Sequence, residues 1–385
     1  MFEPSIPTSN RDEIVRYVDL VSQWREERDE ILHLIDQVAS TGLWVSGPHV
    51  ETLEKDLASL CDSSYARALN SGTDSLVMAM HCLGIGAGDE VITPGNSFIA
   101  STASIVHLGA RPVLADVGDD YNIDVDSVQG LVTSRTKAIM CVHLTGRMAD
   151  IKSLKKVVNE HGLFLVEDSA QAVGARRDGI TSGSAGDFGC FSTHPLKNLN
   201  ALGDGGFVTT SREEFAVRIG RLRSHGLKDR DTSDEFGFVS RLDEIQAAII
   251  QYRLSKLGQI VERRRAIAKY YEEEFLNTRI QFVPERLEEF NTYHTFVVRV
   301  GARDDVRHFM EKRGIETNIH YPKPIHRQPA FNKLFEDVKL PKVEEQANEI
   351  LSIPVHQYLT DAQVEHVAST LKDAVNRVRP GVNVG

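Results

Sequence analysis

Short β-rich runs alternate with helical segments from about residue 65 to residue 210, and this alternation constrains the fold most strongly. Neighbouring parallel strands need a long connection, which is usually a helix. The β-rich runs lie at residues 65–69, 90–93, 112–115, 138–143, 164–167, 189–192 and 207–209. The pattern predicts an α/β unit with a mainly parallel sheet that helices cover on both faces.

Helical patterns flank this unit on both sides. Before it, apolar residues recur at helical spacing at 31–38 and 53–60, and the first helix should stop near Gly42. After it, one long helical pattern runs from about residue 242 to residue 275, as in helices that join a large domain to a small one. We therefore predict a large domain at residues 1–255 and a small α+β domain at residues 256–385.

Charge and composition exclude several classes of protein. A formal net charge of −11 argues against a nucleic-acid binder, which would normally carry a basic face. No apolar run approaches the roughly 18 residues that cross a membrane, and the polar residues 1–11 do not resemble a signal peptide. Four widely spaced cysteines fit free thiols in a reducing cytosol better than disulfides or a zinc site. We expect a cytoplasmic protein that binds neither nucleic acid nor membrane.

Two chemically reactive side chains follow predicted strands. Glu167 and Asp168 end one strand, and Lys197 comes shortly after another, 29 residues beyond Asp168. Because ligands of open α/β sheets bind beyond the carboxyl ends of the strands, the carboxylate and the lysine could converge on one ligand. Taken alone, each has a plainer explanation, since most lysines are exposed and an aspartate often caps a helix.

Pyridoxal 5′-phosphate (PLP) is a ligand that needs such a pair. Its aldehyde reacts with a lysine amine, and an acidic partner keeps the pyridine nitrogen protonated so that the ring can accept electrons. The lysine must be neutral part of the time to act as nucleophile and base, and burial lowers a lysine pKa in that direction. Lys197 and Asp168 therefore predict a PLP site.

The sequence also offers a site for the phosphate. Residues 70–74, Asn-Ser-Gly-Thr-Asp, separate a strand from a helical stretch, which gathers backbone N–H groups at a helix N-terminus. An ordinary helix cap is the alternative. Ser192 could add a hydroxyl, and Phe98 could either stack on an aromatic ring or pack in the core. The glycines at 84–88 precede a strand, which is the wrong context for a dinucleotide motif.

In this order, the motifs resemble the DegT/DnrJ/StrS family of sugar aminotransferases, within the fold-type I PLP enzymes. The resemblance runs over nearly the whole chain, from residue 18 to the last helices. The matching segments are residues 70–74, 86–94, 166–171, 191–198 and 203–206. Each segment is weak evidence alone, but the ordered set is highly specific. The resemblance implies a mainly parallel, seven-stranded mixed sheet between helices and a small C-terminal α+β domain.

The resemblance also implies roles for individual residues. Lys197 would bind PLP as a Schiff base and Asp168 would pair with the pyridine nitrogen. Gln171 would hydrogen-bond the phenolic oxygen, and Phe98 would stack on the ring. The residues expected to hold the phosphate are Gly72, Thr73, Asp74 and Ser192. The residues expected to contact substrate are His194 and, in a loop near the sugar-binding mouth, His320, Tyr321 and His326.

Three positions leave alternatives open. His194 could assist the substrate or be structural, and the two histidines of the 320–326 loop leave a metal site as an alternative that no further ligand cluster supports. The family usually has an asparagine at position 239 that reaches the cofactor phosphate of the partner subunit. Here the position is Val239, whose side chain has no donor. Either Ser240 or Arg241 compensates, or one subunit alone holds the phosphate with one hydrogen bond fewer. A hydrogen bond of this kind is typically worth about 1.5–3 kcal/mol.

We therefore expect an aminotransferase that moves an amino group from glutamate to a nucleotide-linked keto-deoxyhexose, at a site shared within a homodimer. Dehydratases of the family carry histidine at the lysine position, so Lys197 indicates full amino transfer. One alternative is a PLP-binding regulatory protein without turnover, and another is a transferase for a non-nucleotide keto-sugar, a keto-sugar acid or a carbocyclic ketone. A dinucleotide oxidoreductase is disfavoured because no glycine motif follows the first strand.

Overall fold

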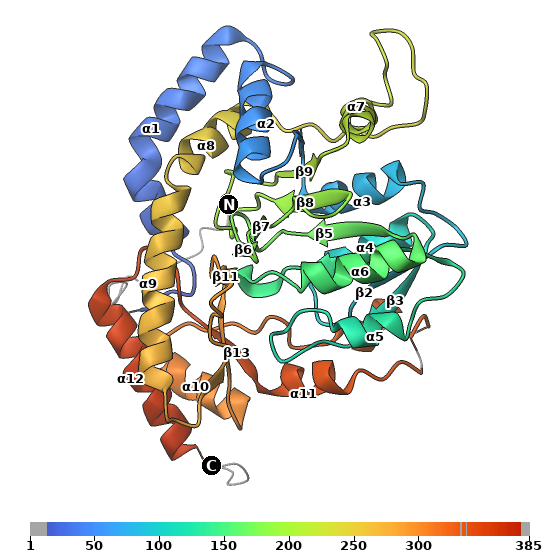
Figure 1. Cartoon of the computed structure of the whole chain (residues 1–385). Helices are drawn as coiled ribbons and strands as arrows, with labels where there is room; N and C mark the ends of the chain where they lie inside the picture. Colours follow the sequence, from blue (N-terminus) through green and yellow to red (C-terminus); the bar gives the residue numbers. More distant parts are fainter. Residues whose placement is uncertain (1–13, 332, 336, 379–385) are drawn as a thin grey trace.

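A mixed seven-stranded sheet forms the centre of the molecule in the computed structural model, which describes residues 14–331, 333–335 and 337–378 (Figure 1). The interpretation of residues 1–11 lies outside the described residues. In spatial order the strands are β1 (Tyr65–Leu69), β9 (Gly206–Thr210), β8 (Phe188–Ser192), β5 (Phe164–Asp168), β4 (Thr136–Val142), β2 (Glu90–Pro94) and β3 (Arg111–Ala115). Only β9 runs against its neighbours. The mainly parallel sheet is confirmed.

Helices cover both faces of this sheet, and apolar side chains on each face form separate cores. On one face lie α3 (Gly72–Cys82), α4 (Ile99–His107) and α7 (Glu213–Leu222). On the other lie α2 (Pro48–Leu60), α5 (Val125–Gln129), α6 (Ile151–His161) and α8 (Glu244–Leu254). None of the described helices is long and apolar enough to cross a membrane.

A second, smaller group of elements lies below the sheet in Figure 1. Its three-stranded sheet has the order β10 (Gln281–Phe282), β12 (Phe296–Arg299) and β13 (Ile350–Ile353). The helices with it are α9 (Leu257–Phe275), α10 (Arg303–Lys312), α11 (Pro341–Glu349) and α12 (Asp361–Arg377). Short strands β6 (Arg176–Arg177), β7 (Ile180–Thr181) and β11 (Glu289–Phe290) form a third sheet, and η1 (Leu144–Gly146), η2 (Ile325–Arg327) and η3 (Pro329–Phe331) are single 3-10 turns.

The single long helix expected before residue 275 is wrong, because the chain breaks at Ser255 and Lys256 between α8 and α9. The break coincides with the predicted domain boundary at residue 255, which stays a prediction. The core beneath α9 also includes Val15 and Tyr121 from before that boundary. The small unit is therefore built from both sides of the boundary, which a division by sequence could not represent.

The N-terminal helix α1 (Leu20–Thr41) is fixed by a buried ion pair. Arg253 on α8 donates from Nη2 to Glu27 Oε2 at 2.8 Å, and both side chains are almost fully buried. Arg253 Nη1 also donates to the carbonyls of Asn200 and Ala201. Breaking a buried pair costs several kcal/mol, so this contact holds α1 firmly against the loop that follows Lys197. The helix ends at Gly42, as predicted, in the left-handed conformation that favours glycine.

Candidate active site

A cavity of about 560 Å³ opens at the carboxyl ends of the parallel strands. Three parts of the chain line it: the segment before α1, the loops that follow β1, β2, β5 and β8, and residues from the smaller group of elements. Its lining includes most of the predicted site residues, namely Gly72, Thr73, Phe98, Asp168, Gln171, Ser192, His194, Lys197, His320 and Tyr321. The fold thus brings together predicted site residues that lie up to 249 positions apart in the sequence (Gly72 to Tyr321).

Lys197 reaches the cavity from a turn that follows β8. Its backbone N–H donates to the His194 carbonyl at 2.8 Å, which closes the turn. Asn198 and Asn200 fasten the turn by donating to the carbonyls of Thr292 and Pro195. Burial lowers the pKa of Lys197 to about 8, although the nearby charge of Asp168 acts in the opposite direction. A substantial fraction of this amine is therefore neutral near pH 8, as a nucleophile requires.

Asp168 is the last residue of β5 and also lines the cavity. Its Oδ2 accepts from Ser101 Oγ at 2.7 Å, and its Oδ1 accepts from the Ala170 N–H at 3.2 Å. Burial raises the pKa of Asp168 and outweighs these bonds and the charge of Lys197. Asp168 and Lys197 make no ion pair with each other, so each can face a ligand in the cavity.

The preceding carboxylate, Glu167, points to the other face of β5 and has a different task. Its Oε2 lies 2.9 Å from His143 Nε2, and its two oxygens accept from the N–H groups of Gly183, Ala185 and Gly186. Burial acts to raise the pKa of Glu167, but these bonds and His143 lower it overall. Glu167 therefore orders the 183–186 turn as a charged acceptor, whereas Asp168 is left for a ligand.

The N-terminus of α3 provides the predicted anion site. Ser71 caps the helix, since its Oγ accepts from the Asp74 N–H at 3.1 Å. Among the described residues, the N–H groups of Gly72 and Thr73 have no hydrogen-bond partner. A side chain at Gly72 would meet Ser192 Cβ at 2.6 Å, so only glycine lets β8 approach this turn. Two unpaired donors at a helix N-terminus beside the Ser192 hydroxyl suit a phosphate.

An aromatic wall faces the two reactive groups. Phe98 is 55% exposed, which excludes the alternative of core packing, and its ring lies 5.7 Å from that of Tyr321. Gln171 Nε2 donates to the Tyr321 hydroxyl at 3.1 Å, and its Oε1 accepts from the Thr145 N–H. The predicted stacking and hydrogen-bonding residues are therefore adjacent.

Two predicted site residues are not brought to the cavity. His326 is buried in η2, where its Nε2 lies 2.7 Å from Glu344 Oε1 on α11. That pairing fastens the loop rather than exposing an imidazole to a substrate, so the predicted substrate contact is not supported. The Asp74 side chain does not line the cavity either, and only its backbone N–H takes part in the α3 cap.

The structure adds lining residues that the sequence did not reveal, namely Tyr17, Ser101, Arg264, His294, Glu316, Asn318 and His356. Arg264 stands in a run of charged residues on α9, a pattern that usually marks a solvated helix face. The smaller group of elements carries five of the seven, all except Tyr17 and Ser101. Only its packing against the sheet edge brings them to Lys197, and no spacing in the sequence announces that packing.

The position usually occupied by an asparagine is exposed here as Val239. The next residue, Ser240, is fully buried, and its hydroxyl donates to Asn70 Oδ1 at 3.0 Å and accepts from the Asn70 N–H at 3.2 Å. Ser240 therefore braces the turn before α3 within its own chain. Of the alternatives that the sequence left open, compensation by Ser240 is disfavoured.

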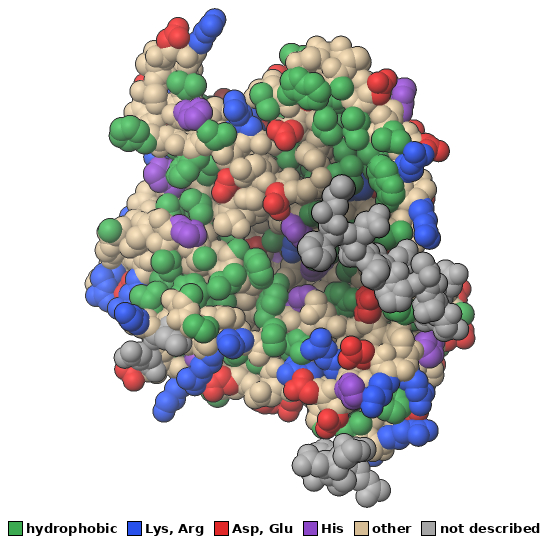
Figure 2. Space-filling view, turned by 180° about the vertical axis from the view of Figure 1, so that it is seen from behind, with side chains coloured by type: hydrophobic (Ala, Val, Ile, Leu, Met, Phe, Trp, Pro, Cys, Tyr) green, Lys and Arg blue, Asp and Glu red, His purple; other side chains and the backbone are tan. Residues whose placement is uncertain are grey.

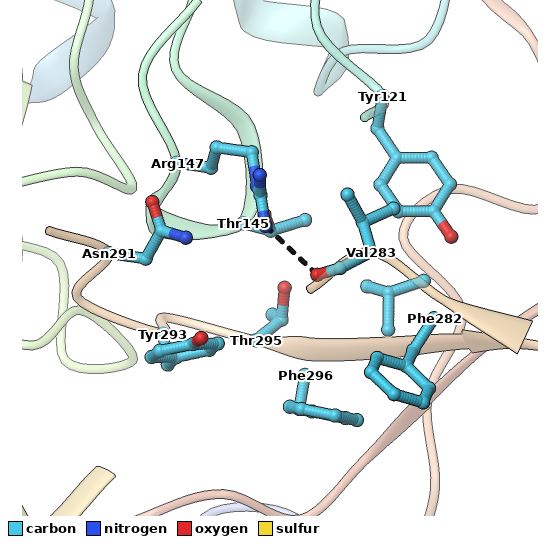
Figure 3. Close-up of a pocket in the computed structure, with 10 residues that line it drawn as sticks. Tyr121, Thr145, Arg147, Phe282, Val283, Asn291, Tyr293, Thr295 and Phe296 are labelled. Atoms are coloured by element: carbon cyan, nitrogen blue, oxygen red, sulfur yellow. Dashed lines mark hydrogen bonds between the residues drawn. The ribbon is translucent and has the colours of Figure 1, made fainter. Parts of the chain in front are cut away.

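A much smaller cavity, of about 30 Å³, lies between the η1 turn and β12 (Figure 3). Arg147 borders it and donates to the Val283 carbonyl at 2.9 Å and to Glu289 at 2.5 Å. Its volume admits a water molecule rather than a substrate. Among the described residues, no cluster of three or more His, Cys, Asp or Glu side chains is arranged to bind a metal ion.

The sequence matches the model of the DegT/DnrJ/EryC1/StrS aminotransferase family over residues 25–372. A dTDP-3-amino-3,6-dideoxy-α-D-galactopyranose transaminase of Aneurinibacillus thermoaerophilus is 38% identical over 94% of this chain and 99% of its own. A protein of Geobacillus stearothermophilus named as a pleiotropic regulatory protein is 35% identical over 93% of this chain and 98% of its own.

Solved structures give the same result for the fold. Streptomyces venezuelae DesV, in complex with a ketimine intermediate, has a TM-score of 0.92 at 36% identity, covering 95% of this chain and 100% of its own. The PLP form of the putative sugar aminotransferase Spr1654 of Streptococcus pneumoniae has a TM-score of 0.86 at 27% identity, covering 91% and 96%. The similarity spans both the large sheet and the smaller group of elements.

Proposed function

Since this chain belongs to the DegT/DnrJ/EryC1/StrS aminotransferase family, we propose that it moves an amino group from glutamate to a nucleotide-linked keto-deoxyhexose. One observation carries the proposal: Lys197, partly buried and with a lowered pKa, shares a cavity with Asp168 and with the open N-terminus of α3. An amine, an acid and an anion site together form the donor set that PLP needs.

The residues present fit PLP as the cofactor. The unpaired N–H groups of Gly72 and Thr73, with the Ser192 hydroxyl, would hold its phosphate. Asp168 would hold the ring nitrogen, and the exposed face of Phe98 would cover the ring. Gln171 would donate to the phenolic oxygen, as it now donates to Tyr321. Lys197 is the one cavity-lining lysine among the described residues and would bind the aldehyde.

When bound, PLP supplies an electrophilic carbon for amines and a ring that withdraws electrons from the carbon next to the amino group. Lys197 would move the proton: its neutral amine would accept the proton from the α-carbon of the donor, become an ammonium group, and release the proton later in the same half-reaction. Asp168, held in place by Ser101 and Ala170, would keep a proton on the ring nitrogen.

Relatives support a nucleotide-linked sugar as the amine acceptor. The relative from Aneurinibacillus thermoaerophilus is named for a dTDP-linked 3-amino-dideoxyhexose, and further relatives at 36% identity are named for dTDP-linked and UDP-linked amino sugars. On the side of Lys197 away from the phosphate site, His194, His320 and Tyr321 could contact the sugar. The buried free cysteines fit the reducing cytoplasm, where we place the reaction.

Exposed apolar side chains support a homodimer with shared active sites. Trp24 on α1 and Trp44 in the turn that follows α1 are exposed. Phe236 and Val239 are also exposed, in the loop between α7 and α8. Figure 2 shows hydrophobic side chains gathered in patches over the surface of the molecule. Large contiguous apolar patches on the surface of a soluble protein often mark protein–protein interfaces. The same loop carries Arg241, two residues after Val239. Arg241 is therefore the remaining candidate to bind the cofactor phosphate of the partner subunit.

The pH dependence of cofactor capture follows from Lys197. Only the neutral amine attacks the aldehyde, and the pKa of Lys197 is lowered to about 8 by burial. The rate at which the cofactor-free protein captures PLP should therefore rise through pH 7 and 8 and level off above about pH 9. Stopped-flow absorbance measures this rate. An ordinary lysine would instead give a rate that still rises beyond pH 10, which would contradict the assignment.

A product assay tests the proposed function. Purified enzyme loaded with PLP is incubated with L-glutamate together with one ketone at a time. The ketones are dTDP-linked keto-deoxyhexoses, UDP-linked keto-sugars, free keto-sugars and a carbocyclic ketone. We expect 2-oxoglutarate and an amino sugar, identified by mass, only with the nucleotide-linked keto-deoxyhexoses. Equal turnover of the free sugar would overturn the nucleotide assignment, and no amino product with any ketone would overturn the function.

A further inference from the structure

The small cavity of about 30 Å³ beside the η1 turn is lined by buried polar side chains with unpaired atoms (Figure 3). The Tyr121 hydroxyl, the Thr295 hydroxyl and Asn291 Oδ1 have no hydrogen-bond partner among the described residues. The three residues are only 6%, 3% and 2% exposed. Buried polar groups are normally bonded to protein or to ordered water, so three unpaired atoms around one cavity indicate a bound molecule.

This cavity lies where the large sheet meets the smaller group of elements. The residues that line it from the side of the sheet are Tyr121, Thr145 and Arg147, and those from the other side are Phe282, Val283, Asn291, Tyr293 and residues 295–297. Direct bonds cross the joint beside it, since the Thr295 N–H donates to the Thr145 carbonyl at 3.3 Å. The two groups of elements are therefore in contact around the cavity but do not fill it.

Charge and size restrict what the cavity can hold. Arg147 is the one charged side chain among the described residues that line it, and Glu289 already pairs with Arg147. A cation would be repelled by Arg147, and an anion would have to compete with Glu289. The volume exceeds the roughly 10–15 Å³ that one water molecule requires but is far below the roughly 300 Å³ of a pocket for a small organic molecule.

The unpaired atoms offer the two kinds of partner that a water molecule needs. Burial raises the pKa of Tyr121, so its hydroxyl stays protonated and can donate. The Thr295 hydroxyl can donate and accept, and Asn291 Oδ1 can accept. A buried water typically makes about three hydrogen bonds, as donor and as acceptor. These atoms therefore suit a neutral molecule that does both.

We propose that this cavity is an internal hydration site, in which ordered water bonds to Tyr121 and Thr295 and joins the large sheet to the smaller group of elements. The site does not depend on the proposed function, but it lies close to the residues that serve it. Thr145, in the lining of the small cavity, donates its N–H to Gln171 Oε1 at 2.9 Å, and Gln171 lines the large cavity. Ordered water at the joint supports the turn that holds Gln171 in place.

A crystal structure of the PLP-loaded enzyme, at a resolution that shows ordered water, tests the site directly. We expect a water within about 2.7–3.2 Å of the Thr295 hydroxyl, and the same or a second water at that distance from the Tyr121 hydroxyl. A cavity without water density would overturn the proposal.

Removing each hydroxyl gives a second test, in which the sign of the effect decides. Thr295→Val and Tyr121→Phe keep nearly the same shape and lose only the polar group. In a dry cavity, each exchange would relieve the cost of burying an unpaired hydroxyl and raise the thermal midpoint. In a hydrated cavity, each exchange removes a hydrogen bond. We expect the thermal midpoint of the PLP-loaded enzyme to fall by about 1–3 °C in each variant.

Thr93→Val is the matched control. Thr93 on β2 is also fully buried, and its hydroxyl also lacks a partner among the described residues, but it does not line this cavity. The same exchange at Thr93 should keep or raise the thermal midpoint. An unchanged or higher midpoint in both Thr295→Val and Tyr121→Phe would overturn the hydration site. If either variant fails to fold, the crystal structure of the wild type still decides.

Discussion

Replacing Lys197 with alanine is expected to abolish amino transfer, with a loss on the order of 10⁴-fold or more in kcat. The variant loses both the amine that binds the cofactor and the group that moves the proton, and acid–base catalysis alone contributes about 10²–10⁴-fold. Lys197 makes no side-chain hydrogen bond or ion pair among the described residues, so the fold should survive. Turnover, the absorbance of the lysine-bound cofactor and the thermal midpoint are measured together.

Lys137→Ala supplies the matched control, because Lys137 is the exposed residue of strand β4 and lies outside the cavity. It should keep wild-type turnover and absorbance. If Lys197→Ala retained turnover close to wild type, the chemical role assigned to Lys197 would be wrong whatever the fold.

Replacing Asp168 with asparagine is expected to lower kcat by on the order of 10²–10⁴-fold while the protein still takes up PLP. The amide has nearly the shape of the carboxylate, and its oxygen can still accept from Ser101 or from Ala170. It cannot, however, hold a proton on the ring nitrogen by charge. The loss should therefore appear in kcat for both half-reactions, which rapid-mixing absorbance measures separately.

The control for this prediction is Asp178→Asn, a carboxylate between β6 and β7 that pairs with the surface lysine Lys152. It should have no effect on either half-reaction. A wild-type kcat in Asp168→Asn would mean that the ring nitrogen does not depend on Asp168, and the orientation proposed for the cofactor would have to be reversed.

Much of the large unit could be predicted because its signals are local. Each strand run bounded by turn residues at 65–69, 90–93 or 164–167 became a strand with nearly the same bounds. Since parallel strands end at one edge, Asp168 and Lys197 could be expected to lie together, and both line one cavity. The positions of residues at the ends of these strands therefore depend little on packing between segments that are distant in the sequence.

The remaining features depend on tertiary contacts. Arg264 stands in a run of charged residues that is typical of a solvated helix face, and only the folded chain buries it against the backbone of Tyr293 and His294. Likewise, His326 belongs to a loop that matched the expected mouth of the site, yet Glu344 on α11 pairs with it away from the cavity. No proline or glycine stands at the break itself, Ser255 and Lys256, although Gly258 follows two residues later.

Trapping the cofactor tests the central claim most directly. The PLP-loaded enzyme is reduced with borohydride, digested, and analysed by mass spectrometry for a lysine that carries the reduced cofactor. We expect the adduct on Lys197 alone, with none in Lys197→Ala, and its amount should fall when L-glutamate is added before reduction. An adduct on another lysine, or an adduct that glutamate does not diminish, would contradict the assignment of Lys197 as the lysine that exchanges the cofactor with the amino donor.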